Sequence, residues 1–214
     1  MKMPLPWLLA GLLALLCASA PVHAQNVALD PGVASLARAT DAVVALSVDG
    51  ALSRSTTNGA SFTAVRPADA PQALFAVAAS GSTVVAMGDA STFVRSTNSG
   101  LTYTALAPAV GSFVGQISAL SAQSSTWVAV GRRGSSIAVI RSADSGATWA
   151  SATTVPSING QLHGVAYTGS RWLAVGADTF GGLVLTSTNG TSWSTLTTTF
   201  DPLYGIATDG AGRL

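Results

Sequence analysis

The sequence predicts an all-β fold, a β-propeller built from four-stranded antiparallel blades. A short turn motif made of Ser, Asp or Asn, Gly and an aromatic residue occurs four times, and its copies begin at residues 55, 96, 142 and 186. The copies are therefore 41, 46 and 44 residues apart. Repeats of roughly 40–50 residues with strand-like flanks are typical of propeller blades. No segment places apolar residues at helical spacing.

The turn motif has the form Ser-x-Asp-x-Gly-x-Thr-Trp in its third copy, Ser142–Trp149. The second copy is Ser96–Tyr103, the first is Ser55–Phe62 with its amide one place later, and the fourth, Thr186–Trp193, is built like the first. Asp or Asn accepts hydrogen bonds from backbone amides about two residues on, glycine adopts the positive φ of the turn, and the aromatic ring packs beneath it. The residues expected to build the four turns are Ser55, Asn58, Gly59 and Phe62; Ser96, Asn98, Gly100 and Tyr103; Ser142, Asp144, Gly146 and Trp149; and Asn189, Gly190 and Trp193.

These turns, called boxes below, resemble the BNR or Asp-box repeat of the sialidase-like β-propellers. The resemblance implies that the boxes are structural and lie away from the active face. It also implies six to eight blades, so we expect a fragment of a longer protein, with a genuine four-bladed product as the alternative. The expected blades span about residues 32–66, 73–106, 115–153 and 162–197, and the first strand of a fifth blade lies in residues 203–214.

Residues 1–24 have the pattern of a secretory signal. Lys2 precedes a short apolar run, and Val22-His23-Ala24 provides small residues for cleavage after Ala24. The run is too short for a membrane-spanning helix. We expect a secreted or periplasmic protein whose mature chain has no transmembrane segment and no cysteine, because Cys17 is removed. Lipidation of Cys17 is a weaker alternative.

Charge and composition limit the partners. Charged residues form 9% of the chain and the formal net charge is +1, whereas soluble proteins average about 25% charged residues. A nearly neutral chain with scattered arginines argues against nucleic acid as a partner. Once the signal is removed, His163 is the single histidine, so we expect no metal site and no other cofactor.

Strand order places the candidate binding site. In an up-and-down blade, the turns after the first and third strands share one rim, here called the box rim. The connections after the second and fourth strands share the opposite rim, the loop rim, and they are long and unlike one another, as binding loops usually are. The alternative is variable side chains beside a solvent-filled channel. The candidate binding residues are Phe75, Asp89, Arg132, Arg133, His163, Asp178 and Tyr204.

Two functions fit these observations. The first is an exported, non-enzymatic propeller that binds a protein or glycan partner or serves as a structural module. The second is a sialidase-like glycoside hydrolase whose catalytic residues lie partly in further C-terminal blades. The resemblance implies a Tyr–Glu pair and an Arg-Ile-Pro motif in retaining sialidases, and this sequence contains neither Glu nor Arg-Ile-Pro. We therefore favour the first function and assign no catalytic residue.

Two further resemblances bear on individual residues. Asp89 and Asp178 could imitate the two aspartates of other Asp-box glycosidases, although nothing in their spacing favours catalysis. Arg54, Arg95 and Arg141 each lie next to a box, and we expect them to be structural or solvated rather than a sialidase-like carboxylate clamp. Propellers of the photosystem II assembly factor type bind proteins through an arginine-rich face, but the arginines here are too few and scattered to support that closely.

Overall fold

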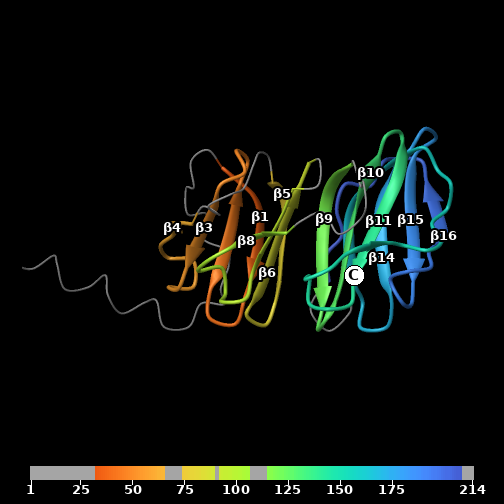
Figure 1. The fold of residues 1–214 in the computed structure, drawn as a ribbon. Helices are drawn as coiled ribbons and strands as arrows, with labels where there is room; N and C mark the ends of the chain where they lie inside the picture. The colour runs from red at the N-terminus through yellow and green to blue at the C-terminus, as the bar shows by residue number, and fades with distance from the viewer. Residues whose placement is uncertain (1–31, 66–73, 90–91, 107–114, 209–214) are drawn as a thin grey trace, which may run out of the picture.

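The computed structural model describes residues 32–65, 74–89, 92–106 and 115–208. Within these ranges the chain forms four sheets, each with four antiparallel strands in sequential order. Figure 1 shows the sheets following one another from the orange first blade to the blue fourth. The predicted all-β fold class is confirmed. The predicted signal, its predicted cleavage site after Ala24 and residues 209–214 lie outside the described residues.

The four blades have closely similar strand plans. The first comprises β1 (Val33–Arg38), β2 (Val43–Ser47), β3 (Leu52–Ser55) and β4 (Thr63–Ala64). The second comprises β5 (Leu74–Ser80), β6 (Thr83–Gly88), β7 (Phe93–Ser96) and β8 (Thr104–Leu106). The third comprises β9 (Gln116–Gln123), β10 (Thr126–Arg133), β11 (Ser136–Ser142) and β12 (Ala150–Ser151). The fourth comprises β13 (Gly160–Tyr167), β14 (Trp172–Asp178), β15 (Gly182–Ser187) and β16 (Ser194–Thr199).

Apolar cores lie between neighbouring blades. Because successive side chains of a strand point to opposite faces, each middle blade contributes residues to two cores. In β6, Val84 and Ala86 pack with the first blade, whereas Val85 and Met87 pack with the third. The first strands of neighbouring blades contact one another, β1 with β5, β5 with β9 and β9 with β13. A one-residue slip in register would move every side chain of a strand to the opposite face of its sheet, and so into the wrong core. The alternation of side chains between the two cores therefore fixes the register of strand pairing.

Each box forms the hairpin between the third and fourth strands of its blade. In the third box the hydroxyl of Ser142 accepts a hydrogen bond from the amide of Gly146 at 2.9 Å. Asp144 accepts from the amide of Thr148 at 2.9 Å and from its hydroxyl at 2.6 Å. Desolvation opposes ionisation of Asp144, but the hydrogen bonds from Thr148 and Ser142 prevail and lower its pKa to about 2. The turn is therefore closed by its own side chains.

The first and fourth boxes differ from the sequence-based prediction. In the first box, the hydrogen bond that closes the turn runs from the amide of Ser61 to Thr57 Oγ1 at 2.9 Å. Asn58, the predicted acceptor, does not make this bond. Asn58 instead adopts a φ of 57°, a conformation that Asn tolerates better than most residues. The fourth box begins at Ser187 rather than one residue earlier, and its hydroxyl bonds Gly190 only three residues on. It is therefore one residue shorter than the other boxes and is not built like the first.

The box aromatics are not equally buried. Trp149 and Trp193 are both 3% exposed, and each indole N–H donates to a box carbonyl at 3.0 Å. Phe62 and Tyr103 are only half-buried. The Tyr103 hydroxyl is buried with no hydrogen-bond partner among the described residues, and burial raises its pKa despite the nearby Arg54. The predicted burial of the aromatic ring beneath the turn is therefore complete for the two tryptophans and partial for Phe62 and Tyr103.

The arginines beside the boxes join neighbouring blades. Arg54 Nε of the first blade donates to the carbonyl of Ser99 in the second box at 2.8 Å. Arg95 Nε of the second blade donates to Ser145 in the third box at 2.9 Å. Arg141 Nε is buried without a partner among the described residues, and the fourth box that it faces is the shortened one. We call the first two contacts the inter-blade arginine bonds.

Residues 203–208 form no strand in the described structure. They lie against the fourth blade, where the amide of Leu203 donates to Gly176 at 3.2 Å and Ile206 lies close to Gly164. The fifth-blade strand predicted within residues 203–214 stays a prediction, because residues 209–214 lie outside the described ranges.

The described part of the chain contains no helix long and apolar enough to cross a membrane.

Candidate binding surface

The first strand of every blade carries a β-bulge at the same place. In β5, Leu74 pairs with Gly88 and Ala76 with Met87, so Phe75 has no residue opposite it. The equivalent irregularities leave out Ala34, Ser118 and His163. A bulge bends its strand and re-aims a side chain. Each blade therefore has one residue in its first strand that has no partner in the antiparallel pairing. Two of these bulge residues, Phe75 and His163, are candidate binding residues predicted from the sequence.

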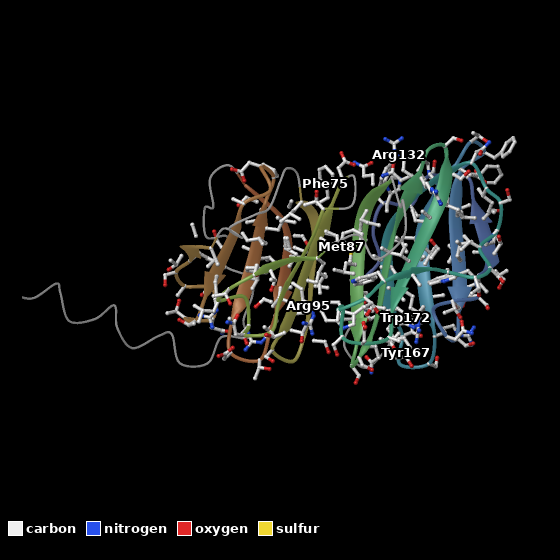
Figure 2. The ribbon with its side chains drawn as sticks, in the orientation of Figure 1. Phe75, Met87, Arg95, Arg132, Tyr167 and Trp172 are labelled. Carbon is white, nitrogen blue, oxygen red and sulfur yellow. The ribbon has the colours of Figure 1, made fainter. Side chains whose placement is uncertain are left out.

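The bulges lie at the loop rim. In Figure 2, Phe75 and Arg132 lie at one end of the blades, and Arg95 and Tyr167 lie at the other. Glycines opposite two bulges permit the close approach of the strands, because a Cβ on Gly131 or Gly176 would collide with the preceding residues of the bulged strand. The arrangement is thus built into the backbone of both strands.

A polar row crosses the loop rim between the third and fourth blades. Gln161 Nε2 of β13 donates to the hydroxyl of the bulge residue Ser118 at 2.8 Å. It also lies 3.5 Å from Gln116 Oε1, which accepts from Arg132 Nε at 3.3 Å. Arg132 and Arg133 are exposed at the end of β10. The predicted binding residue Arg132 therefore belongs to a network whose two glutamines the sequence reasoning did not single out.

Two of the candidate binding residues, His163 of β13 and Tyr204 of the segment after the fourth blade, lie close together. Their ring centroids are 5.2 Å apart with an interplanar angle of 37°. Tyr204 is 73% exposed, and His163 is half-buried. Burial lowers the pKa of His163, which favours the neutral ring at neutral pH. The pair offers an uncharged aromatic surface with hydrogen-bonding edges.

Asp89 and Asp178 lie on the loop rim but on the second and fourth blades, with the third blade between them. Asp89 is exposed and forms an isolated bridge with Gln116. Asp178 Oδ1 accepts hydrogen bonds from the amides of Phe180 at 2.7 Å and Gly181 at 3.0 Å. Asp178 therefore shapes a loop, and the structure does not place the two aspartates on neighbouring blades as a pair.

Several exposed or network-forming residues were missed by the sequence reasoning. Gln116 and Gln161 each immediately precede a buried residue of a first strand, so aligning the blades could have found them. Phe180 and Phe200 are 91% and 99% exposed, and no repeated pattern marks them. Within the described ranges no three His, Cys, Asp or Glu side chains gather to hold a metal ion.

Sequential four-stranded antiparallel sheets, packed face to face with their first strands adjacent, define the β-propeller class of fold. Solved structures of this class resemble the chain at 11–15% identity, which shows the fold alone. No family model matches the sequence, and no curated protein matches it.

Three of these structures illustrate the likeness. Ycf48 from Cyanidioschyzon merolae has a TM-score of 0.62 and 14% identity, with 83% of this chain and 60% of that chain covered. Ycf48 bound to a D1 peptide has a TM-score of 0.60 and 15% identity, with coverages of 77% and 54%. A chain of a nidogen/laminin complex has a TM-score of 0.60 and 12% identity, with coverages of 83% and 69%. The chain thus spans less than two thirds of the two Ycf48 chains.

Proposed function

We propose that the chain is part of an exported, non-enzymatic β-propeller that binds a protein or glycan partner through its loop rim. The observation that carries this proposal is the set of four bulges at equivalent positions. They place unlike side chains, among them Phe75, Ser118 and His163, at one end of adjacent first strands. A rigid scaffold that presents variable side chains at one rim is the usual arrangement of a binding site.

The two rims differ in how their polar groups are satisfied. At the box rim, the side chains of Ser142 and Asp144 bond amides of their own turn. At the loop rim, Arg132 is exposed beside a row of amide side chains, and Tyr204 presents most of its ring to solvent. Exposed polar and aromatic side chains on rigid strands are available to a partner, because Tyr and Arg are enriched where binding energy concentrates.

The comparisons lend limited support. One similar structure is of Ycf48 with a D1 peptide, and another is of a nidogen/laminin complex, so propellers of this shape do occur in complexes with partners. Export is supported by the signal-like pattern of residues 1–24. No observation on the described residues favours the hydrolase alternative, because Asp89 and Asp178 lie on blades that are not neighbours.

A fourfold variant tests the proposal. Arg132, Arg133, His163 and Tyr204 are changed to Ala, and binding to glycan arrays and to exported proteins of the source cell is compared with that of the unchanged chain. None of the four belongs to an apolar core, so we expect an unchanged thermal midpoint and loss of binding.

A matched control changes two exposed residues of the box rim, Asp41 and Arg171, to Ala. This control should retain binding. Binding that survives the fourfold change and is lost in the control would place the site on the box rim and contradict the proposal. Turnover of a fluorogenic sialoside that is lost when one aspartate is changed would instead support the hydrolase.

A further inference from the structure

A pocket of about 410 Å³ lies at the loop rim of the fourth blade, away from the polar row. Two connections form it, the turn between β14 and β15 and the segment that follows β16. Its walls include Asp178, Phe180, Thr198 and Phe200. The volume is in the range of roughly 300–1,000 Å³ that is usual for small-ligand pockets, and the pocket is partly open to solvent.

The two connections hold each other in place. Gly181 has a φ of 152°, and a Cβ there would collide with the carbonyl of Thr199. The hydroxyl of Thr199 donates to Asp201 at 2.8 Å, and the amide of Asp178 donates to Gly181 at 2.9 Å. Each connection is stabilised by a hydrogen bond within itself, and the two connections pack against each other. The pocket is therefore preorganised, which lowers the entropic cost of binding.

The apolar part of the pocket is two unpartnered aromatic rings. Phe180 and Phe200 are 91% and 99% exposed, and neither stacks on any aromatic ring of the described residues. Large aromatic side chains this exposed are uncommon on a protein surface unless they meet a ligand or partner. Their backbone positions are fixed, so packing on a flat ligand has to order only the side-chain torsions of the two rings.

The polar part of the pocket accepts hydrogen bonds. Asp178 uses Oδ1 for the amides of Phe180 and Gly181, which leaves Oδ2 with no partner among the described residues. Thr198 contributes a further hydroxyl. Among the described residues no Lys or Arg lines the pocket, so an anionic ligand would meet a carboxylate with no cation beside it. The lining therefore disfavours an anionic ligand and suits one that combines a flat apolar face with O–H donors.

We propose that this pocket binds a neutral sugar unit of a glycan. The C–H face of a pyranose ring packs on Phe180 or Phe200, and its hydroxyls donate to Asp178 Oδ2, a charge-assisted hydrogen bond of the stronger kind. This site lies on the same rim as the function proposed above, on which it rests, but its residues are separate from the polar row of Gln116, Arg132 and Gln161, so variants of the two sets of residues distinguish the two sites.

The test is isothermal titration of the full chain with three neutral hexasaccharides, maltohexaose, cellohexaose and hexa-N-acetylchitohexaose, and with 3′-sialyllactose as the acidic comparator. We expect at least one neutral sugar to bind and the sialoside not to bind. Phe180→Ala and Phe200→Ala should each weaken that binding about tenfold or more, on the scale of base–aromatic stacking. Asp178→Asn keeps an oxygen for the two loop amides but replaces Oδ2 by a donor, so it should weaken binding without lowering the thermal midpoint.

Two controls separate this site from its surroundings. Leu196→Ala removes another exposed apolar side chain of the fourth blade, outside the pocket, and should leave sugar binding unchanged. The fourfold variant of Arg132, Arg133, His163 and Tyr204 should also bind the neutral sugar normally, so any neutral sugar that this variant still binds is assigned to the pocket and not to the surface around Arg132. The proposal is overturned if none of the three neutral sugars binds, if the sialoside binds better, or if both Phe variants bind as the unchanged chain does. Capture of a protein that depends on Phe180 and Phe200, without sugar binding, would make the pocket a protein-docking site and also overturn it.

Discussion

The third and first boxes are the same hairpin in two different environments. In the third, a Cβ on Gly146 would lie 2.6 Å from Val85 Cγ2 of the second blade, and Trp149 is 3% exposed. In the first, a Cβ on Gly59 would meet nothing within 4 Å, and Phe62 is half-buried. Among the described residues, the third box has a preceding blade to pack against and the first has none.

This difference shows which part of the motif makes the turn and which part joins the blades. The serine hydroxyl bonds the glycine amide at 2.9 Å in both boxes, so the turn needs no neighbour. The aromatic ring and the glycine hydrogen atom matter for packing only where a blade is adjacent. Thr57 can replace the Asp of the third box because only the local hydrogen bond is required there.

The largest effect is expected when Trp149 is changed to Ala. Emptying this buried site should lower the free energy of unfolding on the order of 3 kcal/mol, as measured by urea denaturation. Phe62→Ala is the matched change in the first box, and because its ring is half-buried we expect a loss of about 1 kcal/mol. Equal losses for the two variants would show that burial by the preceding blade is not what distinguishes the boxes.

Changing the box glycines to Ala should give a smaller difference in stability between the two boxes. Gly146 and Gly59 both have positive φ, 77° and 93°, so Ala at either position should cost about 1 kcal/mol in backbone strain. At Gly146 the new methyl group must also displace Val85, which brings the expected loss to about 2 kcal/mol. Chemical denaturation of Gly146→Ala and Gly59→Ala measures the difference, and a Gly59 variant that is the less stable of the two would reverse the interpretation.

The smallest expected effect is the contribution of Asp144 to the loss of stability at acid pH. The pKa of Asp144 is lowered in the folded state to about 2, below the value of about 3.9 for an unfolded chain. Its ionisation therefore stabilises the fold above pH 4, and that stability is lost as the pH falls from about 4 to 2. Asp144→Asn should differ by less than about 0.5 kcal/mol at pH 7, because Asn98 makes the equivalent contacts with Thr102 in the second box.

Urea midpoints at pH 7 and near pH 2.5 check this prediction. The unchanged chain should lose more stability on acidification than Asp144→Asn does. Thr57 is uncharged, so the first box should contribute nothing to the acid sensitivity. An identical pH dependence for the chain and the Asn variant would show that Asp144 does not carry the effect.

The fold could be predicted because its signals are local. The spacing of Ser, Asp, Gly and Trp in the third box specifies one hairpin, and repetition of that hairpin specifies the blades. The bulges could not be predicted, because Phe75, Ser118 and His163 share no chemistry and a bulge arises from pairing between strands. The Phe180–Phe200 pocket was missed for a similar reason, since the two rings come from separate connections and neither belongs to a repeated column.

The inter-blade arginine bonds all run in one direction along the chain, from a blade to the box of the blade that follows. Loss of the following blade would leave a guanidinium without its acceptor, whereas loss of the preceding blade would leave only a carbonyl that water can reach. In a repeat array whose stability is a sum of neighbour interfaces, such one-way contacts make the two ends inequivalent. Through these two contacts the first and second blades depend on their successors, whereas the Trp149 ring of the third box is buried against its predecessor.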